Sequence, residues 1–505
     1  MRCFAAALLL AACTSSPASP PDAALDAMPD APPDAVADAA DVADAAAPCD
    51  EAPGPFAPLS TRCGHFVDGQ GRTVILFGVN ARVRGVFDVE LDMGRAPLEE
   101  IPEFTREDAR AMRALGFNVL RLPLNWSGVE PTEGGGFDGT YLDRVAAIVS
   151  LCREAGLLVL LDMHQDAYSK EIGEDGAPRW AIVPPPTMLL GGPLGDLGAR
   201  RTSAQVLRAF ETFFGDGSDG DRLRMRFARA AAAVARRFVG DTAVLGYETF
   251  NEPIGTDAQV HRVNLAAARA MREADPGHLV VFEPNVTQRQ FTNRSAIPSE
   301  RFPLAGGVYA PHVYPLAFTA TDAQRMSFTL ESLAGATTST RAEARAWGAP
   351  LLITEWGYDP SGIRADAYYD IQQTLQEREM ASAMVWVWKE DSQGAWGLYD
   401  RAAGAWTLRA PMRRRLARVR PQAIAGVPVA YGYDAAARRF TLTYEGRAAV
   451  TAPTVLYVPA AEDFAARWTL TCDGRAVTAT RDEATGRVEV SCAGGGMHTV
   501  VLAAQ

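Results

Sequence analysis

Eight short runs of mainly apolar residues recur along the chain, and helical patterns separate most of them. Each run is five to eight residues long, which suits strands buried on both faces of a parallel sheet. The runs cover residues 73–79, 117–124, 156–162, 243–250, 278–283, 307–313, 350–354 and 382–388. The intervening stretches include "TREDARAMRALG", for which Thr105 is the expected N-cap, and "YLDRVAAIVSLCREAG". This alternation predicts an α/β fold, and its eight repeats predict a (β/α)8 TIM barrel.

A doubly wound open sheet is the alternative fold for such an alternation. That fold commonly carries a Gly-x-Gly-x-x-Gly turn directly after an early strand, and no such turn comes directly after an early run here. We therefore expect a closed catalytic barrel over residues 56–419.

Beyond residue 420 the pattern changes to alternating apolar and polar residues separated by Gly and Asp turns. Stretches such as "RFTLTYEG" and "RVEVSCAGG" predict a small antiparallel β-sandwich over residues 420–505. We expect this domain to pack against the barrel. An autonomous carbohydrate-binding module is the alternative.

Residues 1–13 have the layout of an export signal, with Arg2, an apolar run and then small residues. The run ends in Leu10-Ala11-Ala12-Cys13, which resembles the lipobox of bacterial lipoproteins. In that class the signal is removed before the cysteine, which is then acylated, so the resemblance implies a lipid anchor on Cys13 at a membrane surface. An ordinary secretory signal is the alternative. Both interpretations predict export, either as a membrane-anchored lipoprotein in the periplasm or on the cell surface, or as a secreted protein.

Residues 14–55 predict a disordered linker, because residues 14–48 are nearly all Ala, Pro, Asp and Ser and have almost nothing to bury. Seven aspartates and no lysine or arginine lie in that stretch, so it supplies seven of the chain's net twelve negative charges. The rest of the chain has no basic excess, which argues against nucleic acid as a partner.

Four of the seven cysteines are disulfide candidates. Cys49 and Cys63 flank a Pro-rich loop, while Cys472 and Cys492 bracket a strand–turn–strand pattern. Because exported proteins favour disulfides, we predict two bridges with these pairings and a free, buried Cys152. No Cys-x-x-Cys motif or histidine cluster indicates a metal site, and we expect neither a metal nor a cofactor.

Polar side chains gather where several predicted strands end. In a TIM barrel the strand bodies fill the core, while their carboxyl ends carry the active site. The residues at these ends are Arg121, His164, Asp166, Asn251, Glu252, His312, Tyr314, Glu355 and Trp388. Any one of them can be structural, but their common position predicts an active site.

Two of these residues are glutamates that end the fourth and seventh runs, Glu252 in "GYETFNEP" and Glu355 in "LLITEWG". Those strand ends face each other across the mouth of a barrel, so the two carboxyls should meet there. Cleavage of a glycosidic bond needs such a pair, with one group to protonate the departing oxygen and one to attack the anomeric carbon.

This pattern strongly resembles glycoside hydrolase family 5. The resemblance implies that Glu252 is the acid/base and Glu355 the nucleophile of a retaining hydrolase. It further implies that Asn251 hydrogen-bonds the sugar 2-hydroxyl and that Arg121 and Tyr314 keep Glu355 ionised and oriented.

The same resemblance assigns the rest of the substrate site. His164 and His312 would line the subsite beside the cleaved bond, and Asp166 would contact a neighbouring sugar hydroxyl. Trp388 would offer its face to the sugar ring, with Trp386 pointing the same way two residues earlier.

Glu248, Glu283 and Glu390 are weaker candidates for the catalytic pair. Glu248 lies too deep in its strand, and we expect Glu283 to support the loop that follows the fifth run. Glu390 lies in "WVWKED", where it could reshape the sugar subsites together with Lys389.

Five further stretches are similar to the endoglycoceramidase branch of family 5, over roughly residues 60–505. They are "DMHQDAYS", "DGAPRWA", "GYETFNEP", "YAPHVYP" and "VRPQAIAG". Enzymes of that branch cut between the oligosaccharide and the ceramide of glycosphingolipids, so the resemblance implies a glycolipid substrate. Trp356 and "WVWKED" depart from the branch pattern, which leaves steryl or other lipid glucosides, and then β-glucans or mannans, as alternatives.

Residues 167–242, between the third and fourth runs, are longer than a usual barrel connection. They predict an apolar wall or lid for the lipid part of the substrate; a surface helix pair without a binding role is the alternative. A non-catalytic lectin is disfavoured because both glutamates are present. Transfer of the sugar to an alcohol instead of water stays open. We expect the protein to act as a monomer.

Overall fold

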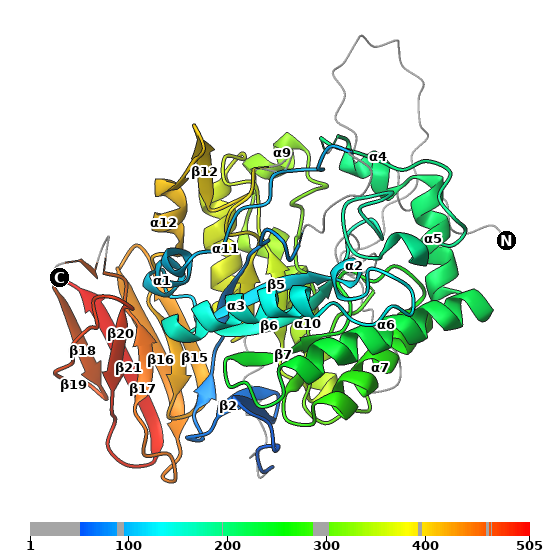
Figure 1. Cartoon of the computed structure of the whole chain (residues 1–505). Helices are drawn as coiled ribbons and strands as arrows, with labels where there is room; N and C mark the ends of the chain where they lie inside the picture. The colour runs from blue at the N-terminus through cyan, green and yellow to red at the C-terminus, as the bar shows by residue number, and fades with distance from the viewer. Residues whose placement is uncertain are drawn as a thin grey trace, which may run out of the picture.

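The computed structural model describes residues 51–505 except 88–94, 194, 286–301, 392–395, 461–463 and 466. Figure 1 shows a barrel surrounded by helices, with the orange and red strands of a C-terminal domain at one side. The predicted signal, Cys13 and most of the predicted linker lie outside the described residues. No helix in the described part of the chain is long and apolar enough to span a membrane.

Eight parallel strands form the barrel and follow one another around it in chain order. The parallel bridges Tyr309–Leu351 and His312–Glu355 join the last edge and close the ring. The strands are β4 (Phe77–Asn80), β5 (Val119–Asn125), β6 (Leu158–His164), β7 (Val244–Glu248), β8 (Leu279–Phe282), β9 (Gly307–Tyr309), β10 (Leu352–Trp356) and β11 (Ser382–Val385). The predicted TIM barrel is confirmed.

Helices cover the outside of the barrel. Thr105 caps α1 through a reciprocal capping box with Asp108, and α3 and α10 end at Gly156 and Gly348 in the left-handed conformation that glycine adopts without steric cost. The helices of the wall are α1 (Arg106–Ala114), α3 (Gly139–Ala155), α6 (Ser218–Arg237), α7 (Asp257–Ala274), α10 (Leu330–Trp347) and α11 (Ala365–Arg378). The connections contain α2 (Trp126–Val129), α9 (Asp322–Met326), α12 (Ala410–Leu416) and the hairpin of β12 (Tyr399–Ala402) and β13 (Ala405–Leu408).

The long segment between β6 and β7 is anchored to the barrel by aromatic side chains. Phe213 packs against Phe250, Phe227 and Trp126, with ring centroids 5.5, 5.8 and 6.3 Å apart. Burying one such ring contributes about 1.5–3 kcal/mol, so this part of the segment belongs to the core. The segment contains η1 (Arg179–Ala181), α4 (Leu197–Arg201), α5 (Ala204–Phe214) and the wall helix α6.

The C-terminal domain consists of two antiparallel sheets that share one core, as predicted. Leu442 of one sheet and Leu456 of the other are completely buried in the same hydrophobic cluster. The first sheet contains β15 (Gly426–Asp434), β16 (Arg439–Gly446), β21 (Gly496–Ala504), β18 (Trp468–Cys472) and β19 (Arg475–Ala476). The second contains β1 (Leu59–Arg62), β2 (His65–Asp68), β3 (Thr73–Val74), β14 (Arg420–Ile424), β17 (Thr454–Tyr457) and β20 (Arg487–Val490).

The first apolar run divides between the two domains. Its start, β3, pairs with β14, and Ile75 lies in the core of the C-terminal domain, while Phe77 begins the barrel strand β4. The segment that we predicted as the barrel, 56–419, therefore contributes β1–β3 to the neighbouring sheet. Hydrophobic periodicity does not distinguish the two parts, because both are buried.

The C-terminal domain packs against the amino-terminal end of the barrel. Val74 and Val455 of its sheet share a hydrophobic cluster with the barrel residues Val119 and Leu279. The Tyr457 hydroxyl donates to the carbonyl oxygen of Ala114 at 3.0 Å, at the end of α1. The opposite end of the barrel, where the strands finish, is left to the connecting loops.

Cys472 and Cys492 form a disulfide with their Cα atoms 5.9 Å apart, the pairing that the sequence predicts. Cys63 is disulfide-bonded, and its predicted partner Cys49 lies outside the described residues. Cys152 is free and buried on α3.

Candidate active site

The carboxyl ends of the barrel strands bring most of the predicted site residues into one hydrogen-bonded network. These residues are Arg121 in β5, His164 at the end of β6, Asn251 and Glu252 after β7, His312 and Tyr314 after β9, and Glu355 in β10.

Glu252 and Glu355 approach each other across the mouth of the barrel. One carboxylate oxygen of each and one ring nitrogen of His312 lie within 4.8 Å of one another. The Nδ1 atom of His312 is 2.9 Å from Glu252 Oε1 and 3.4 Å from Glu355 Oε2. Carboxyl pairs of inverting glycosidases are about 6.5–9.5 Å apart to admit a water, whereas retaining pairs are about 5–5.5 Å apart. The observed separation favours retention.

Arg121 is a completely buried cation that organises this network. Its guanidinium donates to Glu355 at 2.6 Å, to Glu248 at 2.7 Å and to Asn251 at 2.8 Å, and it lies 3.0 Å from Asp162. Burial alone lowers the pKa of Arg121, but the three carboxylates outweigh burial and hold it well above its ordinary value. A buried charge is costly unless it is paired, so the site has one stable arrangement around this cation.

Each oxygen of Glu355 has its own hydrogen-bond donor. Oε1 accepts from Arg121, and Oε2 accepts from the Tyr314 hydroxyl at 2.9 Å. Burial raises the pKa of Glu355 well above its usual range; Arg121 and Tyr314 oppose the rise, and the charge of Glu252 adds to it. The two donors stabilise the ionised form of Glu355 and so oppose the effect of burial.

Glu252 has an unusual backbone conformation, with φ at 43°. This left-handed conformation costs a non-glycine residue on the order of 1–3 kcal/mol. The N–H of Glu252 donates to Glu283 Oε2 at 2.6 Å, and its carbonyl oxygen accepts from Gln165 Nε2 at 3.2 Å. The side chain is 18% exposed, compared with 7% for Glu355, so Glu252 is the more accessible carboxyl of the pair.

Asn251 is held between two strands of the barrel. Its Oδ1 accepts from Arg121, and its Nδ2 donates to the carbonyl oxygen of Gln165 at 3.0 Å. Among the described residues Nδ2 has this one acceptor, and its second hydrogen is compatible with the predicted sugar contact.

His164 lies flat against Trp386, with ring centroids 5.9 Å apart and planes 9° from parallel. Its Nδ1 atom is 2.6 Å from Asp162 Oδ2. Burial, helped by the charge of Arg121, lowers the pKa of His164 to about 3, so the imidazole is neutral. Burial raises the pKa of Asp162 to about 7. Since Asp162 occupies Nδ1, Nε2 is the nitrogen that can face a substrate.

Two models of known protein families match most of this chain. The profile described as "Cellulase (glycosyl hydrolase family 5)" matches residues 68–392, which is more than half of the chain, and that of the "Glycoside hydrolase family 5 C-terminal domain" matches residues 418–502. The chain belongs to glycoside hydrolase family 5.

Its relatives within family 5 include endoglycoceramidases. Endoglycoceramidase I of Rhodococcus hoagii is 29% identical over 436 residues, which cover 80% of each chain. Endo-glycoceramidase II from Rhodococcus sp. in complex with ganglioside GM3 superimposes with a TM-score of 0.70 at 26% identity, covering 87% of this chain and 99% of that one. Its lactosyl-enzyme intermediate gives a TM-score of 0.68 at 27% identity, with the same coverage.

Trp388 does not line the family 5 site, contrary to our prediction. The side chain is 1% exposed, and its indole N–H donates to Asp108 Oδ1 at 2.9 Å. Strand β11 ends at Val385, and Trp388 packs outside the mouth, against Phe117. Trp386, partly exposed and stacked on His164, is the tryptophan of the two that lies beside the predicted site residues.

Asp166 lies at the edge of the site and is already paired. Its carboxylate accepts from both Nε, at 2.7 Å, and a terminal nitrogen of Arg201 in α4. With 19% of its side chain exposed, it can still accept a sugar hydroxyl. The pair ties the inserted segment to the catalytic face.

Asp162 and Gln165 belong to the network but were not predicted as site residues, and Glu283, a weaker candidate expected to support its loop, belongs to it as well. Asp162 and Gln165 flank His164 in "DMHQD", so their sequence neighbourhood was the available signal. Glu283 ends the fifth run much as Glu252 ends the fourth, and it supports Glu252 as well as its own loop. Glu248, which we expected to lie too deep for catalysis, accepts a hydrogen bond from Arg121 inside the barrel.

The described residues bring three groups of potential metal ligands together, but each group has another role. The groups are Cys472, Cys492 and His498; Glu248, Glu283 and His312; and Glu252, His312 and Glu355. The two cysteines form a disulfide and offer no thiolate. In the barrel, Glu248 and Glu355 already pair with the guanidinium of Arg121.

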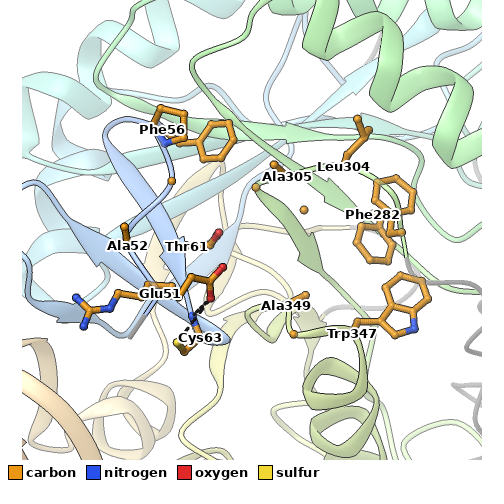
Figure 2. A pocket seen from close by; sticks show the side chains of 17 residues that line it. Glu51, Ala52, Phe56, Thr61, Cys63, Phe282, Leu304, Ala305, Trp347 and Ala349 are labelled. Carbon is orange, nitrogen blue, oxygen red and sulfur yellow. Dashed lines mark hydrogen bonds between the residues drawn. The ribbon is translucent and has the colours of Figure 1, made fainter. Parts of the chain in front are cut away.

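A separate cavity of about 250 Å³ lies at the amino-terminal end of the barrel (Figure 2). Phe56, Phe282 and Trp347 form its apolar wall, and Glu51 accepts the N–H of Cys63 at 3.2 Å beside it. None of the polar strand-end residues lines this cavity, so it is not the active site.

The two tryptophans after β11 should respond differently to substitution. We expect Trp386→Ala to lower kcat/KM by about 10- to 100-fold, because it removes an apolar face worth roughly 1.5–3 kcal/mol from the sugar site. Trp388→Phe should leave kcat/KM within about twofold and lower the free energy of unfolding by about 1–3 kcal/mol, because the buried Asp108 loses a donor. Steady-state kinetics and urea unfolding measure the two effects. The reverse pattern would restore Trp388 to the sugar site.

Proposed function

We propose that this protein is a retaining endo-β-glycosidase that releases the glycan from the lipid part of a glycolipid. The observation that carries the proposal is the short separation of Glu252 and Glu355, each within 4.8 Å of the other and of His312. The similarity to endoglycoceramidases over 80% of the chain supports the lipid-linked substrate.

In the first step, Glu355 attacks the anomeric carbon while protonated Glu252 gives its proton to the glycosidic oxygen. The bond to the lipid breaks, the lipid leaves as an alcohol, and the glycan is held on Glu355 as an ester. Arg121 and Tyr314 stabilise the negative charge of Glu355 before it attacks. This charge is lost as the ester forms and returns when the ester is cleaved.

In the second step, a water attacks the anomeric carbon from the side that the lipid left. Glu252, now a carboxylate, takes a proton from this water, and Glu355 leaves as a carboxylate. Two displacements at one carbon return the original configuration.

Exposed apolar side chains on the carboxyl-end loops support a lipid leaving group. Phe318, which follows β9, is 42% exposed and stacks on Trp396, with ring centroids 5.1 Å apart. Trp396 also packs against Tyr314, with ring centroids 5.9 Å apart, and the Tyr314 hydroxyl donates a hydrogen bond to Glu355. Met188, on the segment after β6, is 61% exposed. Phe318 and Trp396 offer apolar surface for an alkyl chain beside Tyr314, and Met188 offers apolar surface on the inserted segment.

Product analysis tests the proposal directly. Incubation with lactosylceramide, a ganglioside, a steryl glucoside and a soluble β-glucan should yield intact oligosaccharide and free ceramide from the sphingolipids, detected by thin-layer chromatography and mass spectrometry. Glu355→Gln should lower turnover by more than about 10³-fold with an unchanged circular dichroism spectrum, because it removes the nucleophile and keeps the shape.

Shortened β-glucan with untouched glycolipids would contradict the proposed substrate. Methanol added to the reaction distinguishes water from an alcohol as the acceptor, because transfer would yield a methyl glycoside.

The inserted segment provides a second test of lipid recognition. Replacing Met188, Leu189 and Leu190 with alanine should lower kcat/KM for a long-chain glycolipid by about tenfold or more and leave a soluble aryl glycoside nearly unchanged. Met225→Ala on the outer helix α6, where the methionine is also exposed, is the matched control. Equal losses on both substrates would remove the segment from lipid binding.

We further propose that the protein is exported and anchored through acylated Cys13, and that it acts as a monomer. The lipobox-like residues and the acidic linker support a tethered enzyme beside membrane lipids. The catalytic pair and its hydrogen-bond partners all belong to one barrel, so the proposed site needs no residue from a second copy. The wild-type protein should carry acyl groups by mass spectrometry and sediment with membranes, while Cys13→Ala should not; an unacylated wild-type protein would contradict the anchor.

A further inference from the structure

Glu283 stands directly behind the acid/base residue. Its Oε2 atom accepts the backbone N–H of Glu252 at 2.6 Å, a short hydrogen bond. The side chain is 1% exposed, and its other oxygen has no hydrogen-bond partner among the described residues. The carboxyl is therefore buried chiefly for this one contact.

Glu283 also faces the second partner of Glu252. His312 lies between the two glutamates, with Nδ1 2.9 Å from Glu252 Oε1 and Nε2 3.5 Å from Glu283 Oε2. Glu283 thus borders Glu252 on two sides, through its main chain and through the imidazole that touches its carboxylate.

Neighbouring elements hold Glu283 in place. Asn264 of α7, itself buried, donates to the Glu283 carbonyl oxygen at 2.7 Å and accepts from the Thr249 hydroxyl at 2.7 Å. Thr249 begins the loop that leads from β7 to Glu252. The loops after β7 and β8 are therefore clamped to one helix residue.

The arrangement is costly and needs a function that offsets the cost. Burial, together with the charges of Glu252 and Glu248, raises the pKa of Glu283 well above its ordinary value, while the Glu252 N–H and Arg121 act in the opposite direction. The carboxyl of Glu283 accepts the N–H of Glu252, and the left-handed backbone of Glu252 is the feature that this contact maintains.

We propose that Glu283 is a positioning residue for general acid/base catalysis, which holds Glu252 in its left-handed conformation so that its carboxyl reaches the glycosidic oxygen. This inference rests on the proposed function. Without the acceptor, the peptide between Asn251 and Glu252 relaxes and the carboxyl moves, while Arg121 and Tyr314 keep the nucleophile in place.

The test compares Glu283→Ala, which removes the acceptor, with Glu283→Gln, which keeps a carbonyl oxygen for the Glu252 N–H. Aryl β-lactosides with good and poor leaving groups are the probes: a dinitrophenyl group departs without a proton, whereas departure of an unsubstituted phenyl group depends on one. For Glu283→Ala we expect kcat/KM to fall by about 10²-fold with the poor leaving group and less than about threefold with the good one. Glu283→Gln should recover most of the loss.

Azide provides an independent readout. It attacks the glycosyl ester on Glu355 without giving up a proton, so it bypasses the base role of Glu252. Azide should therefore raise kcat of Glu283→Ala on the dinitrophenyl substrate and form a glycosyl azide of retained configuration, with little effect on the wild-type enzyme or Glu283→Gln. Glu343→Ala, which removes another buried glutamate hydrogen-bonded to Tyr309 on the outside of the barrel, controls for general destabilisation.

Equal losses of Glu283→Ala on both leaving groups, without azide rescue, would overturn the inference and leave the proposed function intact. A wild-type enzyme that cleaves neither aryl lactosides nor glycolipids would overturn the proposed function and this inference with it.

Discussion

The charge of Arg121, buried in the middle of the barrel, is the constraint on which the rest of the site depends. A guanidinium without solvent is tolerated only when carboxylates surround it, and Asp162, Glu248 and Glu355 do so at 2.6–3.0 Å. Removing one partner of such a buried cluster costs about 3–5 kcal/mol of stability, because the remaining charge is uncompensated. The cation therefore fixes the nucleophile and, through Asn251, the loop that carries the acid/base.

The barrel supplies these partners because its strands pair in a fixed register. Asp162 of β6 lies opposite Glu248 of β7, and the closing bridge sets His312 opposite Glu355. Side chains from neighbouring strands thus meet in layers, with a charged layer directly below the catalytic carboxyls. The C-terminal domain packs against the other end of the barrel, away from these carboxyls.

Much of this arrangement is predictable from local patterns. Buried parallel strands appear in the sequence as continuous apolar runs. A polar residue at the carboxyl end of such a run is expected to lie at the mouth of the barrel. Periodicity fails where the chain leaves the strand. Trp386 and Trp388 are two positions apart in the sequence, yet Trp386 stacks on His164 whereas Trp388 donates a hydrogen bond to the buried Asp108. Contacts between distant segments are also invisible to a local pattern: Arg201 reaches Asp166 from the inserted helix α4, and β3 joins β14 across most of the chain.

The central claim is that Glu355 becomes covalently attached to the glycan while Glu252 handles the proton. A 2-deoxy-2-fluoro β-lactoside with a good leaving group tests it, because the fluorine slows hydrolysis of the ester and lets it accumulate. Peptide mass spectrometry of the inactivated enzyme should find one fluorolactosyl group on the peptide containing Glu355. A label on another residue, or release of an inverted sugar with no label at all, would contradict the account.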